Sequence, residues 1–346
     1  MSWYSARGGT KKGFRYSQMM LNRGAVAGVS LARVMAHCGG DPKAAVRYVA
    51  GAIASAPEAA EPYAVLADLW QEQRQSLAAV LEGADSLPVV LAQSYVSFLE
   101  NDMDVAVMAL GSVVGAQPTV AWAKAPWFSD ARFLGSVRAE AVAEAVMRTM
   151  DHGRGLDVPA VREGLRPWFD AIDVVCDREP LSEAMAKMAI FLRACGLTDE
   201  SFALCDRADS VAPVMLTEVV RAGTWRRLGD PGQTAASFHR ALALEPGNWS
   251  LYLDLADLHA EQGDFAAAAR FAGEGLEHGP TETTLRAAEA AYRARHSGEP
   301  DALRDLIALV PHLPNDSYQA LLIDHACASP ALPAHLIAEA RRLRHG

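Results

Sequence analysis

Residues 229–280 read GDPGQTAASFHRALALEPGNWSLYLDLADLHAEQGDFAAAARFAGEGLEHGP, and the stretch repeats itself at a fixed distance. The pair Gly229-Asp230 recurs 34 residues later as Gly263-Asp264, and a proline follows each glycine after 17 residues. Glycine favours the left-handed turn that ends a helix, aspartate caps the next helix, and proline stops it. The spacing therefore predicts successive pairs of helices.

Other positions in the second copy indicate how its helices pack. Tyr252, Leu255 and His259 fall at i, i+3 and i+7, so they share one helix face. Ala256 and Ala268 are small where two antiparallel helices would cross, because a larger side chain would force the backbones apart. The pattern resembles the tetratricopeptide repeat, a two-helix unit of 34 residues. The resemblance implies an all-α fold, a right-handed α-solenoid of antiparallel helix pairs.

The distance from turn to stop recurs elsewhere in the chain. It separates the following pairs: Gly40 and Pro57, Asn101 and Pro118, and Gly196 and Pro213. We therefore predict a basic N-terminal arm over 1–24, a first repeat block over 25–118 and a second over 181–314. Capping helices near 317–326 and 333–344 are expected to fill the last segment, 315–346.

The period is lost between residues 119 and 180, where large aromatic residues gather. These are Trp122, Trp127, Phe128, Phe133, Trp168 and Phe169. We expect an irregular insert of three helices, near 128–134, 137–151 and 159–175. The insert either shapes a pocket or forms a packing joint between the two repeat blocks, and we favour the joint.

Composition narrows the function classes. The chain has 346 residues, of which 51% are hydrophobic and only 7% aromatic, which suits helix packing better than sheets. A formal net charge of −10 argues against a nucleic-acid binder. No segment has the ~20 apolar residues of a membrane span. The five cysteines are an odd number without a close pair, which favours the reducing cytoplasm.

The basic arm over 1–24 has two interpretations. It is either a docking segment for an acidic partner, or a terminus that frays or folds back on the acidic body. We predict that residues 1–16 are dispensable for folding, because they lack helical periodicity and carry only positive charge.

No catalytic or metal-binding motif stands out, so we predict no cofactor and no enzymatic activity. His259 occupies an aromatic packing position and is expected in the core. Cys195 and Cys205 lie inside predicted repeat helices and are expected to be small buried residues.

In tetratricopeptide repeats the first helix of each pair lines a concave surface. The resemblance thus implies a partner-binding groove formed by Lys187, Ile190, Arg193, Arg221, Ser250, Leu253, Asp254 and Asp257. Some family members clamp a peptide carboxylate with Lys, Asn and Arg, whereas Asp254 and Asp257 stand here where Asn would be wanted. This departure favours a ligand of positive or mixed charge. We expect both aspartates to be exposed, so that reversing their charges leaves the fold intact.

The sequence therefore predicts a non-enzymatic protein–protein interaction module or adaptor that binds a peptide segment or partner protein. Neither nucleic acid nor membrane is an expected partner. Two alternatives remain open. The chain could be a self-associating accessory or regulatory subunit that forms homo-oligomers, or an enzyme with its site in the 119–180 insert.

Overall fold

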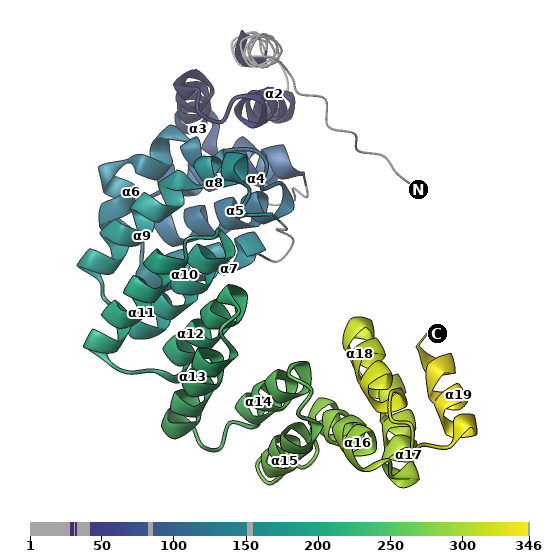
Figure 1. Cartoon of the computed structure of the whole chain (residues 1–346). Helices are drawn as coiled ribbons and strands as arrows, with labels where there is room; N and C mark the ends of the chain where they lie inside the picture. The colour runs from purple at the N-terminus through teal and green to yellow at the C-terminus, as the bar shows by residue number, and fades with distance from the viewer. Residues whose placement is uncertain (1–27, 31, 33–41, 82–85, 151–154, 345–346) are drawn as a thin grey trace. The chain divides into compact units, whose positions relative to one another are not determined.

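The computed structural model describes residues 28–30, 32, 42–81, 86–150 and 155–344, and every regular element in these ranges is a helix (Figure 1). The expected all-α solenoid of helix pairs is confirmed. The basic arm over 1–24 and the turn at residues 40–41 lie outside the described residues. The chain divides into two compact units between Ala212 and Pro213. This division falls inside the predicted block 181–314, so the predicted domain boundaries stay predictions.

The first unit contains the first repeat block, the insert and one further helix pair. Its elements are α2 (Pro42–Ser55), α3 (Ala60–Leu81), α4 (Leu87–Leu99), α5 (Met103–Ala116), η1 (Trp122–Lys124), η2 (Pro126–Ser129), α6 (Ala131–Ser136), α7 (Ala139–Met150), α8 (Pro159–Gly164), α9 (Arg166–Arg178), α10 (Ser182–Ala194) and α11 (Thr198–Val211).

The second unit continues with helix pairs and closes with single helices. Its elements are α12 (Met215–Leu228), α13 (Pro231–Leu244), α14 (Trp249–Glu261), α15 (Phe265–Leu276), α16 (Thr283–Ser297), α17 (Pro300–Leu309), η3 (Val310–His312), α18 (Asp316–Cys327) and α19 (Ala334–Leu343). The two capping helices thus form within one or two residues of the predicted ranges.

The residues that were expected to turn the chain do so. The left-handed φ angles that end first helices, between 66° and 79°, belong to Asn101, Gly196, Gly229, Gly263 and Gly298. Asp264 then caps α15, because its carboxylate accepts a hydrogen bond of 3.0 Å from the backbone N–H of Ala267. Local chemistry therefore sets the helix boundaries in the repeats.

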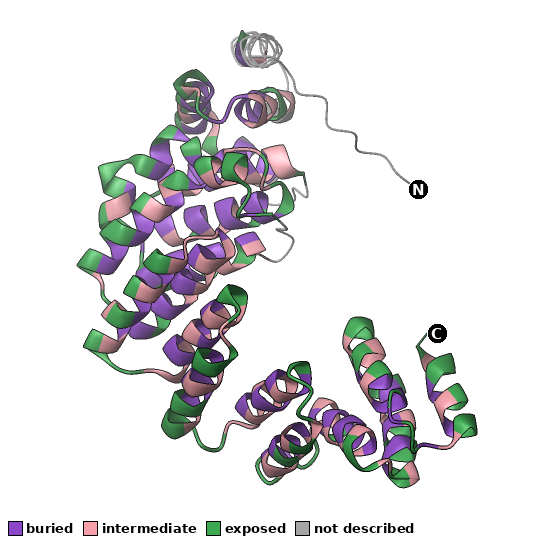
Figure 2. Cartoon of the chain, in the orientation of Figure 1, coloured by how far each residue is buried: buried purple, intermediate pink, exposed green. Residues whose placement is uncertain are grey.

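Alternating contacts between first and second helices build the core of the second unit. The second helix α15 packs against its own first helix α14 and against the next first helix, α16. Ala256 and Ala268 are fully buried, as expected for helix crossings. Position 275 requires glycine, because a Cβ there would lie 2.8 Å from the Tyr252 side chain. Figure 2 shows the buried residues along the faces on which these helices meet.

The insert is a packing joint built around a buried aromatic cluster. Trp127, Phe128, Phe133 and Trp168 are almost fully buried, and their neighbouring rings lie 4.7 to 5.8 Å apart. Helix α7 packs against α5 on one side and α10 on the other, so it links the first repeat block to the next helix pair. The predicted helix over 137–151 corresponds to α7.

Two of the helices predicted for the insert are each divided in two in the structure. The predicted helix over 159–175 is two helices, α8 and α9, which meet at Leu165. The predicted helix over 128–134 is likewise divided, into η2 and α6. Helix α3 has a kink at Gln73, which leaves helical geometry (φ −135°, ψ 32°).

Of the three residues expected to be buried, the two cysteines are, whereas His259 lies at the edge of the core. Cys195 and Cys205 are fully buried. His259 is half-buried, with its ring stacked on Phe271 at a centroid distance of 5.1 Å.

Candidate functional site

The predicted groove residues fall in both units. Lys187, Ile190 and Arg193 lie on α10 in the first unit, and all three are half-buried. Lys187 forms an ion pair with Glu144 of α7. Arg193 is likewise already engaged within the chain. The charge of Lys187 is therefore partly neutralised before any partner binds.

Arg221, on α12 of the second unit, is neutralised in the same way. Its guanidinium donates to Glu218 at 2.9 Å, and Arg240 of α13 donates to the other oxygen of the same carboxylate, also at 2.9 Å. The side chains of Arg221 and Glu218 are only 12% and 11% exposed. This ion pair belongs to the packing between α12 and α13.

The other four predicted residues lie on α14, and we call Ser250, Leu253, Asp254 and Asp257 the α14 wall. They recur at i, i+3, i+4 and i+7 and are all half-buried. The Ser250 hydroxyl donates to Asn248 at 2.7 Å and so belongs to the start of the helix. Leu253 packs against the core of the second unit.

Asp257 is held in place by the first helices that follow α14. It accepts hydrogen bonds from the hydroxyls of Tyr292, on α16, and Tyr318, on α18, the latter at 2.9 Å. Burial raises the pKa of Asp257, while the two tyrosine hydrogen bonds oppose that shift. The expectation that this aspartate is a simple exposed charge is therefore wrong, because residues 35 and 61 positions further on cover it.

Asp254 differs from Asp257 in having no hydrogen-bond or ion-pair partner among the described residues. Burial, together with the nearby Asp257 carboxylate, raises the pKa of Asp254 from 3.8 to about 6. Arg226 only partly offsets this shift, since its guanidinium already donates to both carboxylate oxygens of Glu261, at 3.0 and 2.6 Å. The α14 wall thus carries one carboxylate whose charge is poorly compensated.

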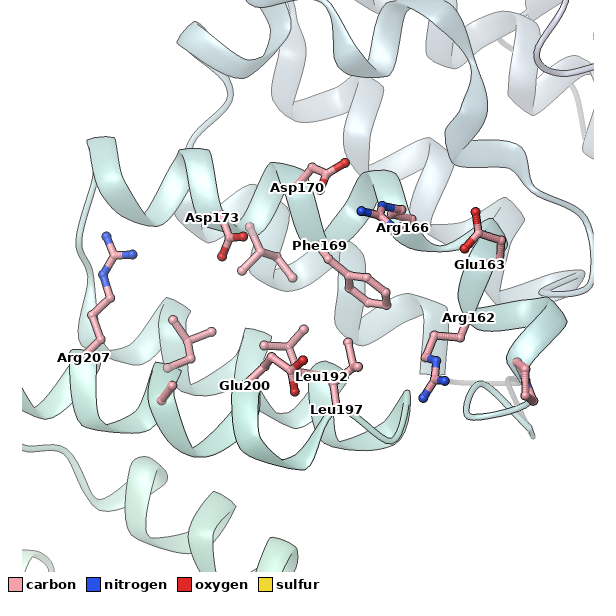
Figure 3. Close-up of a pocket in the computed structure, with 14 residues that line it drawn as sticks. Arg162, Glu163, Arg166, Phe169, Asp170, Asp173, Leu192, Leu197, Glu200 and Arg207 are labelled. Atoms are coloured by element: carbon pink, nitrogen blue, oxygen red, sulfur yellow. The ribbon is translucent and has the colours of Figure 1, made fainter.

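A separate cleft of about 690 Å³ lies in the first unit, where α8 and α9 face α10 and α11 (Figure 3). We call it the α9–α11 cleft. Its apolar lining is Phe169, Ile172, Leu192, Leu197 and Leu204. Charged residues also line it, among them Arg162, Arg166, Asp173, Glu200 and Arg207.

The sequence offered a pocket shaped by the insert as an alternative to a packing joint, and the insert does line this cleft, but the lining residues from α10 and α11 were not predicted. Phe169 was the one lining residue noted in the insert. Its ring projects into the cleft, whereas the other large aromatic residues of the insert are core.

The described ranges hold neither a metal cluster nor a membrane span. No group of three or more histidine, cysteine or acidic residues is placed to hold a metal ion within the described part of the chain. None of the helices described is long and apolar enough to span a membrane.

Comparison with known proteins identifies the repeats. The family model for the tetratricopeptide repeat matches residues 226–292, which include α14, α15 and the α14 wall. The chain is therefore a protein that contains tetratricopeptide repeats, with no specific member of the family indicated. Repeats of this class support a general role in protein–protein interaction. No curated protein matches the chain.

Solved structures with a similar arrangement share little sequence with this chain. A thermophilic TPR protein from Thermus thermophilus is 18% identical, with a TM-score of 0.36 over 60% of this chain and 98% of that one. The type IV pilus biogenesis factor PilW is 15% identical, with a TM-score of 0.37 over 72% and 98%. A tetratricopeptide repeat protein from Parabacteroides merdae ATCC 43184 is 12% identical, with a TM-score of 0.37 over 96% and 100%. At these TM-scores the matches do not bear on the partner.

Proposed function

We propose that this protein is a non-enzymatic interaction module whose α14 wall binds a partner segment through a Lys or Arg side chain. The observation that carries the proposal is Asp254, a half-buried carboxylate without a hydrogen-bond or ion-pair partner among the described residues. A cation beside it would compensate both its burial and its repulsion by Asp257.

The surroundings of Asp254 favour a directional contact. Asp257, one helical turn away, is fixed by Tyr292 and Tyr318, so the two carboxylates project from a rigid helix. A site whose polar groups are already oriented loses less conformational entropy when it binds. Leu253 adds an apolar contact beside the acids. A peptide laid along α14 would be recognised by charge and by apolar contact together.

The charge balance of the predicted groove favours a basic partner over an acidic one. Lys187 and Arg221 already pair with glutamates, so they offer little to an anion. Asp254 has no such partner among the described residues. The net charge of −10 also favours a basic partner during encounter. We accordingly propose a basic segment in place of the mixed-charge ligand that the sequence had left open.

The test is a selection of peptides from a random library against the folded chain. The selected peptides should be enriched in Lys or Arg. Their affinities would then be measured by fluorescence anisotropy for the wild type and for Asp254→Asn, which keeps the shape of the side chain but removes its charge. We expect a loss of tenfold or more, since contacts between close charge pairs are commonly worth about 1.5 kcal/mol or more.

Glu277→Gln is the matched control, because it removes one negative charge from an exposed residue just after the second helix α15. It should bind the selected peptides with unchanged affinity. Selected peptides without basic residues, or equal losses in the two variants, would refute the proposed site.

We also propose a location and consider a competing function. Cytoplasmic localisation is supported by the odd number and wide spacing of the cysteines. Self-association through the repeats is the competing function, and a mass that rises with protein concentration would favour it.

A further inference from the structure

The α9–α11 cleft has no role in the function proposed for the α14 wall. Its residues lie in the first unit, and the α14 wall lies in the second. The apolar part of the cleft is accessible at two side chains, since Phe169 and Leu197 are both half-buried. Figure 3 shows the Phe169 ring projecting between the helices that border the cleft. The cleft thus offers an apolar surface on which one bulky side chain can pack.

Charges of both signs surround this apolar surface, and Glu163 lies beside Arg162 at the α8 end (Figure 3). Arg162 and Arg166 lie at the α8 end of the cleft, whereas Asp173 lies toward its other end and Glu200 on the opposite helix (Figure 3). None of these four side chains has an ion-pair partner within the described ranges. Arg207, by contrast, is paired with Asp177 at 2.7 Å. The α8 end of the cleft therefore carries two cations against one anion, Glu163, whereas Asp173 and Glu200 make the charge further along negative.

The spacing fits a short extended segment. Arg166 and Asp173 are two turns apart on α9, which corresponds to about 10 Å along the helix axis. In an extended peptide, side chains at i, i+2 and i+4 point to the same side, and the outer two are about 13 Å apart. Side-chain flexibility covers the difference. The volume of about 690 Å³ is in the range of roughly 300–1,000 Å³ that is usual for ligand sites.

We infer that the α9–α11 cleft is a second binding site, for a peptide segment with a bulky apolar residue between an acidic and a basic residue. The apolar side chain packs on Phe169 and Leu197. The acidic residue binds Arg162 and Arg166, and the basic residue binds Asp173 and Glu200. The protein then engages two segments, one on each unit, and such a pair of sites raises avidity when both segments belong to one partner.

The first experiment measures binding of labelled peptides to the full chain by fluorescence anisotropy. The probes are Glu-Ser-Phe-Ser-Lys and the reversed sequence Lys-Ser-Phe-Ser-Glu, each flanked by Gly-Ser spacers, since either chain direction satisfies the charge order. At least one should bind tenfold or more tightly than probes with two Glu, with two Lys, or with Ala in place of Phe. Equal binding of all the probes would overturn the inference. Free phenylalanine should not compete, because its ammonium and carboxylate groups are bonded to the same Cα and cannot reach both ends of the cleft. Full competition would show a small-molecule site instead.

Charge reversal then locates the site. Arg162→Glu with Arg166→Glu should weaken the better mixed-charge probe by tenfold or more and strengthen the probe with two Lys. Arg47→Glu is the control, since Arg47 is exposed on α2 and does not line the cleft. Unchanged affinity in the double variant would place the site elsewhere.

A measurement on the wild type does not depend on the variants folding. Amide chemical shifts of the isotope-labelled chain should move on α8, α9 and α11 when the better mixed-charge probe is added. Shifts confined to the α14 wall would overturn the second site while leaving the proposed function intact. The two proposals can therefore fail separately.

Discussion

Asp254→Asn should make the protein more stable at neutral pH, although it removes the residue on which the proposed function depends. Burial and the Asp257 carboxylate raise the pKa of Asp254 from 3.8 to about 6, so the folded state disfavours the ionised form. One pKa unit corresponds to about 1.4 kcal/mol. The ionised carboxylate therefore costs the folded state at most about 3 kcal/mol. Because Asp254 retains some contact with solvent, we expect asparagine to recover about 1–2 kcal/mol.

The pH dependence separates this electrostatic effect from a change in packing. Below about pH 4 the carboxyl group is protonated in both the folded and the unfolded chain, so its burial carries no charge penalty. As the pH rises from about 4 to about 6, the unfolded chain ionises first, and the penalty on the folded state grows. Above about pH 6 the penalty is complete. The stabilisation by asparagine should thus be near zero at about pH 4 and greatest above about pH 7.

Urea unfolding of the wild type, Asp254→Asn and Glu277→Gln, followed by circular dichroism from about pH 4.5 to about pH 8, measures the difference. The control should stay within about 0.5 kcal/mol of wild type throughout, because Glu277 is exposed. A neutral or destabilising Asp254→Asn at about pH 7.5, or a gain that is the same at every pH, would refute the reasoning. If Asp254 lowers the stability of the free protein, this is consistent with a residue whose charge is compensated only when a cation binds.

Three further predictions concern packing, and urea unfolding checks each of them. Ala268→Leu should lower the free energy of unfolding by about 1–3 kcal/mol, because Ala268 is fully buried at a helix crossing. Ala266→Glu should stay within about 0.5 kcal/mol of wild type, because Ala266 is exposed. The reverse order would show that the helix register is wrong. Gly275→Ala should destabilise by about 1–3 kcal/mol, because the new Cβ would meet a neighbouring side chain at 2.8 Å. Gly273→Ala, on the same helix but facing open space, should instead stabilise by about 0.5–1 kcal/mol, and equal effects of the two alanines would contradict the packing of α15. Asp257→Ala should cost about 2–4 kcal/mol, since two tyrosine hydroxyls lose their acceptor, and a loss below about 0.5 kcal/mol would show that these hydrogen bonds are unimportant.

The repeat helices could be predicted from the sequence because short-range chemistry determines where they begin and end. Gly263 adopts the left-handed angle and Asp264 caps the following helix regardless of what packs around them. The break between α8 and α9 also has a local signal that the prediction of one helix over 159–175 did not use, since Gly164 ends α8 and Pro167 stands in the first turn of α9.

The candidate sites were less predictable because their properties come from residues distant in sequence. Spacing placed Asp254 and Asp257 on one helix face, but the partners of Asp257 are Tyr292 and Tyr318, on two later helices. Only the tertiary structure shows that one aspartate is satisfied while the other has no partner among the described residues. The α9–α11 cleft depends in the same way on Phe169 of the insert meeting a helix pair from the following block.

The most direct test of the account is the pKa of Asp254 with and without a bound basic peptide, measured by carbon-13 NMR of its side-chain carboxyl group. In the free protein we expect a pKa of about 6. Binding of a Lys- or Arg-containing peptide selected from the library should lower it by about one unit or more, because an adjacent cation favours the ionised carboxylate. A pKa that stays at the same value when the peptide is bound would mean that the cation lies elsewhere, and would contradict the proposed role of the α14 wall.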